Sequence, residues 1–255
     1  MRFASLGSGS KGNALLVEAG HTRILLDCGF GPRETAARLA RLGCGPEALS
    51  GILVTHEHSD HIAGAFTLAG RWRLGIWMTH GTLSACRGAG SEDACVEVID
   101  SHRPFRVGDL EVQPFPVPHD AREPVQFTFS DGRHRLGVLT DLGCTTPHVE
   151  RTLSGCDALV LECNHDEEML RTGDYPLMLK RRIGGRLGHL DNASAAGLLK
   201  AIDVSRLRHI VAAHLSQQNN TPALARRALA AALGCADAWI GVADQDEGFG
   251  WRDLL

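Results

Sequence analysis

The sequence predicts an α/β fold, a sandwich of two mixed β-sheets with helices on the outside. Strand-like and helix-like segments alternate along the 255 residues, and each half of the chain supplies strands and then helices. No internal repeat, low-complexity tract or Pro/Gly/Ser-rich linker divides the chain, and its 44% hydrophobic content is ample for a sizeable core. We therefore expect residues 1–255 to form a single domain.

In the first half, short apolar runs predict strands and longer stretches with helical apolar spacing predict helices. After residue 99, apolar residues alternate as in a strand at Val107, Leu110, Val112 and Phe115. The predicted strands are residues 2–6, 14–18, 22–27, 52–54, 74–78 and 96–99, and the predicted helices are residues 32–42, 62–69 and 82–87.

In the second half, two apolar runs flank Ser130-Asp131-Gly132-Arg133, a turn signal that predicts a hairpin. Thr221-Pro222 is a favourable helix start, because Thr caps the helix and Pro fits its first turn. The predicted strands are residues 125–129, 136–140, 158–162, 209–213 and 238–242, and the predicted helices are residues 147–153, 167–170, 176–183, 192–202 and 222–233.

Composition limits the classes of function. The net charge of −4 argues against a protein whose whole surface grips nucleic acid, although a local basic patch remains compatible with it. No apolar run is long enough for a signal peptide or a membrane span, so we expect a cytoplasmic protein without a membrane partner. The eight cysteines contain no C-x-x-C pair, which favours buried free thiols over disulfides.

The most informative segment is Thr-His-Glu-His-Ser-Asp-His at residues 55–61, directly after the apolar run 51–54. It holds four potential metal ligands, His56, His58, Asp60 and His61, which packing alone does not explain. Imidazoles two residues apart at a strand end can point the same way, while the later carboxylate and imidazole can reach a neighbouring ion. The spacing therefore suits two metals.

Residues 7–12 match the glycine pattern G-x-G-x-x-G of dinucleotide-binding proteins. That fingerprint requires a helix directly after the glycines, whereas residues 13–20 are short, apolar and ended by Gly, as in a strand. We therefore expect a tight turn here, whose amides and Lys11 could still approach a phosphate.

A dinuclear site needs further ligands at strand ends, and His119, Asp141 and His214 each follow an apolar strand-like run. A lone His or Asp at such a position is usually a surface or capping residue. The first cluster, however, strengthens the interpretation of all three as metal ligands. All seven candidates offer nitrogen or oxygen, which suits Zn²⁺ as well as Mn²⁺ or Fe²⁺.

The cluster His56-x-His58-x-Asp60-His61 resembles the HxHxDH signature of the metallo-β-lactamase-fold superfamily. The resemblance implies a four-layer αβ/βα sandwich and two metal ions. It assigns His56, His58 and His119 to one ion, Asp60, His61 and His214 to the other, and Asp141 as a bridge. Longer strings, among them residues 8–13, 118–125, 161–166 and 214–222, resemble the YycJ/WalJ-type proteins over nearly the whole chain.

That group is regarded as DNA exonucleases related to ribonuclease Z and to cyclic-phosphate phosphodiesterases. The resemblance therefore implies that a hydroxide shared by two metals attacks phosphorus. It makes His189 the general acid and Glu162 its partner, and Asp60 also counts among the catalytic residues. Glu162 as a salt-bridged strand end and His189 as part of a helix cap are the plain alternatives.

Five basic residues against one acid in residues 171–186 could track a phosphate backbone, or simply form a solvated helix face. The single Tyr and the absence of aromatic-basic interleaving offer no obvious stacking platform. A cyclic-phosphate phosphodiesterase is the alternative to a DNA exonuclease, followed by a lactam or thioester hydrolase. The candidate substrate contacts are Lys11, His165, Lys180, Arg181, Arg182 and Asn219.

Overall fold

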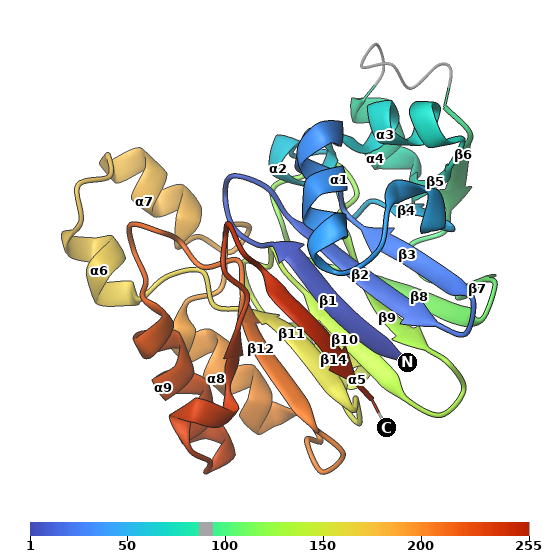
Figure 1. Cartoon of the computed structure of the whole chain (residues 1–255). Coiled ribbons are helices and arrows are strands. Elements are labelled where there is room, and N and C mark those ends of the chain that lie inside the picture. Colours follow the sequence, from blue (N-terminus) through green and yellow to red (C-terminus); the bar gives the residue numbers. More distant parts are fainter. Residues whose placement is uncertain (87–93, 255) are drawn as a thin grey trace.

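The computed structural model describes residues 1–86 and 94–254, which form two seven-stranded sheets lying face to face (Figure 1). The first sheet has the order β14-β1-β2-β3-β4-β5-β6, and β3 to β6 run parallel. Its strands are β1 (Arg2–Gly7), β2 (Ala14–Ala19), β3 (Thr22–Leu26), β4 (Gly51–Leu53), β5 (Gly75–Thr79), β6 (Val96–Ile99) and β14 (Phe249–Asp253).

The second sheet has the order β13-β12-β11-β10-β9-β8-β7. Strands β10 to β13 are parallel, and β7 to β10 form an antiparallel meander. Its strands are β7 (Phe105–Val107), β8 (Leu110–Pro116), β9 (Val125–Ser130), β10 (Arg135–Leu139), β11 (Ala158–Glu162), β12 (His209–Ala213) and β13 (Gly241–Val242). Both sheets are mixed, as predicted.

Helices lie outside the sheets, with α1 to α4 beside the first sheet and α8 and α9 beside the second, while α6 and α7 project from the body (Figure 1). The helices are α1 (Pro32–Arg41), α2 (Ser59–Ile62), α3 (Ala65–Trp72), α4 (His80–Ala85), α5 (Pro147–Leu153), α6 (Glu167–Thr172), α7 (Leu177–Ile183), α8 (Asn192–Ala201) and α9 (Pro222–Leu233).

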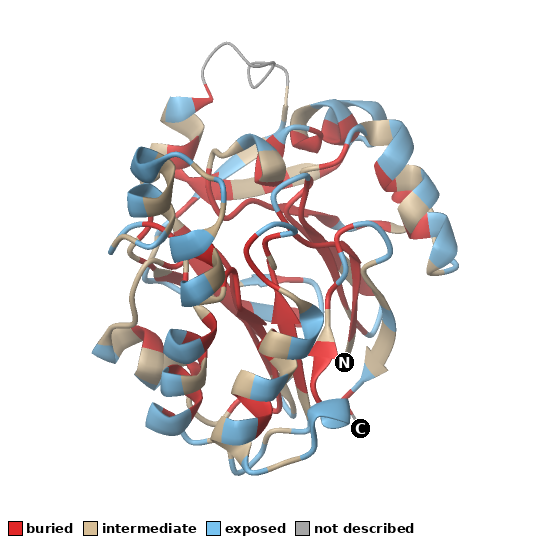
Figure 2. Ribbon diagram, turned by 90° about the vertical axis from the view of Figure 1, so that its left-hand side faces the viewer, coloured by how far each residue is buried: buried red, intermediate tan, exposed pale blue. Residues whose placement is uncertain are grey.

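Strand alternation creates three apolar layers, which appear as buried strands flanked by helices with exposed outer faces (Figure 2). On β3, Ile24 and Leu26 pack between the sheets, whereas Leu25 faces α1 and α3. On β11, Val160 packs between the sheets, while Leu159 faces the helices of the other side. Because both faces of each sheet are covered, the strands end at fixed positions from which loops can present side chains.

Several elements differ from the sequence prediction. The single helix expected at residues 62–69 is two helices, α2 and α3, separated at Gly64. A Cβ on Gly64 would lie 2.0 Å from the backbone oxygen of Phe30, so close backbone packing interrupts the helix there. The strand expected at residues 238–242 is a 3₁₀ turn (Asp237–Trp239) followed by the two residues of β13.

The C-terminal strand, the cysteines and the helix lengths can also be compared with the sequence prediction. Strand β14, which pairs antiparallel with β1, was not predicted, and residue 87 of the predicted helix 82–87 lies outside the described residues. None of the eight cysteines is part of a disulfide, and Cys28, Cys86, Cys156 and Cys163 are buried whereas Cys95 is exposed. Among the described helices, none combines the length and apolar character needed to cross a bilayer.

Candidate metal centre and active site

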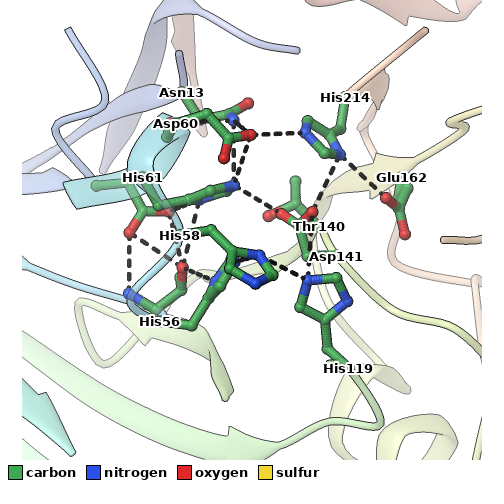
Figure 3. A network of polar contacts seen from close by, with 12 residues as sticks. Asn13, His56, His58, Asp60, His61, His119, Thr140, Asp141, Glu162 and His214 are labelled. Atoms are coloured by element: carbon green, nitrogen blue, oxygen red, sulfur yellow. Dashed lines mark hydrogen bonds and ion pairs between the residues drawn. The ribbon is translucent and has the colours of Figure 1, made fainter. Parts of the chain in front are cut away.

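The predicted ligands meet at one edge of the sandwich, where loops leave strands of both sheets (Figure 3). The first sheet contributes the loop after β4, and the second contributes the loops after β8, β10 and β12. Those three strands run in the same direction, so their carboxyl ends share an edge. The side chains brought together are His56, His58, Asp60, His61, His119, Asp141 and His214.

Three imidazoles form the first donor group. Nε2 of His56 lies 3.0 Å from Nδ1 of His58, and Nε2 of His119 lies 3.3 Å from that same atom. The second ring nitrogens of His119 and His56 are also anchored. Nδ1 of His119 donates to the carbonyl of Gly188 at 3.0 Å, and Nδ1 of His56 lies 2.9 Å from Oγ1 of Thr55. Imidazoles whose second nitrogen is anchored in this way are typical of metal ligands.

A carboxylate and two imidazoles form the second donor group. Oδ2 of Asp60 lies 3.5 Å from Nε2 of His61 and 3.5 Å from Nε2 of His214. Asp141 lies between the two groups, with Oδ2 2.9 Å from His61 Nε2 and Oδ1 3.9 Å from His119 Nε2. This arrangement agrees with the partition that the family resemblance implies, while the ligand roles stay predictions.

Two buried atoms test whether these residues suit a cation. Within the described part of the chain, Oδ2 of Asp141 and Nε2 of His214 are buried and make no hydrogen bond of normal geometry, although they lie 2.9 Å from His61 Nε2 and 3.5 Å from Asp60 Oδ2, respectively. Buried polar atoms are normally paired because an unpaired one costs its full desolvation energy. A buried carboxylate oxygen and a buried imidazole nitrogen without a normal hydrogen bond therefore fit a divalent metal, with nitrogen and oxygen as donors.

The electrostatics of the two groups differ. Burial lowers the pKa of His56 and of His119, so these imidazoles favour the neutral form that binds metals. Burial alone would also lower the pKa of His214, but Asp141, Asp60 and Glu162 raise it to about 10. Burial is likewise outweighed at His61, whose pKa is raised by Asp141 and Asp27. The carboxylates around His61 and His214 therefore favour positive charge at the second donor group.

Glu162, at the end of β11, binds two imidazoles with one oxygen. Its Oε1 lies 2.9 Å from Nδ1 of His189 and 3.1 Å from Nδ1 of His214, and Oε2 accepts from the backbone N–H groups of Leu142 and Leu190. Burial alone would raise the pKa of Glu162, but His189 and His214 lower it to about 2. Glu162 is therefore an anionic acceptor that orients both rings.

His189 belongs to neither of the two donor groups but lies next to them. Its Nδ1 lies 3.3 Å from Oδ1 of Asp141, and its side chain is 22% exposed. Burial alone would lower the pKa of His189, but Glu162 raises it. The donor atoms of Asp141, Glu162, His189 and His214 also lie within 4.8 Å of one another, so His189 is close enough to act as a ligand itself.

A cleft of about 370 Å³ opens in front of these groups, and its lining includes His58, Asp60, Asp141 and His189. Arg182 of α7 also lines the cleft, and its Nε donates to Oδ2 of Asp120 at 2.6 Å. The other oxygen of Asp120 lies 3.5 Å from Nε2 of His119. An ion pair thus joins α7 to the loop that carries His119.

The other predicted substrate residues lie elsewhere. His165 and Asn219 are buried and do not line the cleft, and the carbonyl of Asn219 accepts from the N–H of Asp166 at 2.8 Å. Lys180 donates to the carbonyl of Arg171 at 2.9 Å, and Arg181 is exposed on α7. Lys11 lines a neighbouring cavity.

Sequence reasoning missed several residues of the site. Asp27 accepts hydrogen bonds from Thr55 and lies 2.8 Å from Nδ1 of His61. The amide of Asn13 contacts the same ring at Nε2, 3.1 Å away. Asp27 ends a strand at the edge where His56 follows β4, a signal that could have found it. Asp27, Asp141 and His214 all have a left-handed backbone, with φ of 60°, 55° and 54°.

Comparison with known proteins identifies the class. Residues 22–214 match the β-lactamase superfamily domain, and the chain belongs to this superfamily. It is 36% identical to exodeoxyribonuclease YycJ of Bacillus anthracis over 237 residues, which cover 91% of this chain and 89% of that protein. It is 32% identical to exodeoxyribonuclease WalJ of Streptococcus pneumoniae serotype 2 over 245 residues, covering 94% and 91%. The predicted family is confirmed.

The fold is shared with a solved structure. A Zn²⁺-bound PqqB from Methylobacterium extorquens superposes with a TM-score of 0.76 at 20% sequence identity, covering 100% of both chains. The predicted sandwich of two mixed sheets with outer helices is therefore confirmed. Family membership and the donor groups together indicate a site for divalent metal.

Proposed function

We propose that this protein is a dinuclear metal-dependent phosphodiesterase that degrades DNA as an exonuclease. The observation that carries the proposal is the convergence of seven nitrogen and oxygen donors from both sheets, with His189 held beside them in an open cleft. The likeness to two exodeoxyribonucleases over about nine-tenths of the chain supports DNA as the substrate.

The donor atoms support two ions, Zn²⁺, Mn²⁺ or Fe²⁺. His56, His58 and His119 would hold one ion, Asp60, His61 and His214 the other, and Asp141 would contact both. When bound, such a pair lowers the pKa of a water nucleophile and neutralises charge on the attacked phosphate. Since ligands come from both sheets, we infer that the two sheets act as one catalytic unit.

The chain's own residues account for proton delivery. The Nδ1–H of His189 donates to Glu162, which leaves Nε2 on the side of the cleft. A proton at Nε2 can then pass to the leaving oxygen as the phosphodiester bond breaks. Glu162 keeps this ring oriented and charged, because it is anionic and fixed by two backbone N–H groups.

Arg182 supports binding of the substrate phosphate. Asp120 accepts from its Nε, and among the described residues no hydrogen bond engages its Nη atoms. The guanidinium therefore keeps a fork of donors that matches phosphate oxygens. Arg171, by contrast, is paired with Glu168 and fully solvated, so it belongs to the helix surface.

The test uses metal-analysed protein with 5′-labelled and 3′-labelled single- and double-stranded DNA, in Mn²⁺ and in Zn²⁺. We expect mononucleotide release from one end, lost in Asp141→Ala. Asp141→Asn is the matched control, because it keeps the shape and removes the charge. Intact DNA together with rapid opening of a cyclic phosphate ester would overturn the proposal in favour of a small-molecule phosphodiesterase.

A further inference from the structure

A second cavity, here called the side groove, adjoins the cleft. It has a volume of about 270 Å³, and Ser10 and Tyr175 line both the cleft and the side groove. Tyr175 belongs to residues 173–176, which connect α6 to α7, the two helices that project from the body (Figure 1). The remaining wall is built from Lys11, Gln217 and Gln218 over buried Ser216 and Gln245.

Two hydrogen-bonded loops hold the walls of the side groove. In the first, Oε1 of Gln245 accepts from the N–H of Lys11 at 2.9 Å, and its Nε2 donates to the carbonyl of Gly12 at 3.0 Å. In the second, Ser216 donates its N–H to Asn164 at 2.8 Å, and its hydroxyl accepts from the N–H of Asn219 at 3.1 Å. The backbone is therefore fixed before any ligand arrives.

The side chains on these walls remain available to a ligand. Lys11, Gln217 and Gln218 are exposed, and in the described ranges no hydrogen bond or ion pair engages their terminal groups. Tyr175 is half-buried, and within the same ranges its ring and hydroxyl have no partner. The side groove thus offers one ammonium, two amides and one aromatic face.

The charge of the side groove differs from that of the cleft. The chain has 30 acidic residues, yet no carboxylate lines the side groove, whereas Asp60, Asp120 and Asp141 line the cleft. An anion that cannot approach the carboxylates of the cleft without a metal meets only a cation and neutral amides here. A strand of DNA carries a phosphate at every nucleotide, so a second phosphate beside the cleft needs such a site.

We propose that the side groove binds the nucleotide next to the scissile phosphate, with that nucleotide's phosphate at Lys11 and its base against the ring of Tyr175. This inference rests on the proposed function and adds a second binding position for the DNA strand, beside the cleft. Stacking on an aromatic ring tolerates every base. Gln217 and Gln218 both donate and accept, so they also suit any base edge.

The test compares two substrates, a single-stranded oligonucleotide and methyl p-nitrophenyl phosphate, a diester too small to extend beyond the cleft. In Tyr175→Ala we expect kcat/KM for the oligonucleotide to fall about tenfold more than for the small diester, as loss of one stacked base predicts. Tyr175→Phe keeps the ring and should restore most of the difference. Thermal melting checks that each variant is folded.

Lys11→Ala gives an independent measurement. We expect the salt dependence of oligonucleotide KM to weaken by about 0.7 in the log–log slope, the amount for one phosphate contact on a single strand. Lys200→Ala, an exposed cation on α8, is the matched control and should leave both substrates unaffected.

The outcomes separate the two proposals. If the wild-type protein degrades DNA but the variants lose both substrates equally, or lose neither, the side groove is not a nucleotide subsite and the exonuclease proposal stands. If the wild-type protein hydrolyses the small diester but leaves DNA intact, both proposals fall.

Discussion

Oδ2 of Asp27 lies 2.8 Å from Nδ1 of His61, and the same carboxylate accepts from Oγ1 of Thr55. That hydroxyl in turn lies 2.9 Å from Nδ1 of His56. One buried carboxylate is therefore linked to an imidazole of each donor group, directly in one case and through a hydroxyl in the other. The two groups are oriented by a common anchor beneath the cleft.

Replacing this anchor should weaken metal binding without unfolding the protein. In Asp27→Asn we expect metal affinity to fall about 10- to 100-fold, the usual effect of losing a hydrogen-bond partner behind a metal ligand. Competition with a chelator measures the affinity. Asp157→Asn is the control, because Asp157 is equally buried but pairs with Arg206 at the other end of β11. Equal metal affinity in both variants would contradict the prediction.

His189 should govern the chemical step and not metal content. We expect His189→Ala to lower kcat about 10²- to 10⁴-fold with full metal occupancy, as removal of a general acid does. Glu162→Gln should lower both kcat and metal affinity, since Glu162 holds His214 as well as His189. Loss of one metal equivalent in His189→Ala would instead make His189 a ligand.

The Asp120–Arg182 pair should position the substrate phosphate. In Arg182→Ala we expect KM for DNA to rise and the slope of log KM against log salt to fall by about 1. Arg182→Lys keeps the charge but not the fork of donors, so we expect only partial recovery. Arg181→Ala tests a neighbouring cation of α7 outside the cleft, and a loss as large as that of Arg182→Ala would argue against a specific clamp.

Glu18 gives a pH dependence of stability away from the metal centre. It accepts from Nε of Arg2 at 2.6 Å and from Nε of Arg23. Burial alone would raise the pKa of Glu18, but the two guanidinium groups lower it. The ionised carboxylate therefore stabilises the folded chain above the unfolded-state pKa of about 4.3, and this stabilisation is lost as pH falls through the lower folded-state pKa.

We expect Glu18→Gln to destabilise the protein at pH 7 by up to about 1 kcal/mol, the value typical of partly exposed ion pairs. The difference from the wild type should shrink below about pH 4. Denaturant titrations at several pH values measure it, beside Glu111→Gln, an exposed glutamate on β8. A deficit that stays constant down to pH 3 would rule out the ion pair as its cause.

Much of the fold could be predicted because burial imposes a clear period on the strands. Strands β2 and β11 match their predicted ranges within one residue, since their apolar residues fill the layers between and outside the sheets. Strand β14 escaped prediction because its partly exposed residues alternate weakly and Gly250 interrupts them. Its stability comes from pairing with β1, about 250 positions earlier in the chain.

The candidate site could be predicted where its residues lie close together in the sequence. The cluster His56, His58, Asp60 and His61 stands out by itself, and the strand-end residues follow from it. The Asp120–Arg182 pair joins residues 62 positions apart, and no local pattern signals it. His165 shows the converse, since the family resemblance placed it near the cleft, yet it is buried and does not line the cleft.

The left-handed backbone at Asp27, Asp141 and His214 places a conformational cost at three positions of the candidate metal centre. A residue with a Cβ holds this conformation at a cost of roughly 1 to 2 kcal/mol relative to the right-handed one, whereas Gly adopts it freely. Gly would remove this cost at these places, but it would also remove the side chains that contact the donor groups. Asp and His at these positions therefore lower the stability of the fold, and engineering for heat tolerance should leave these three residues unchanged.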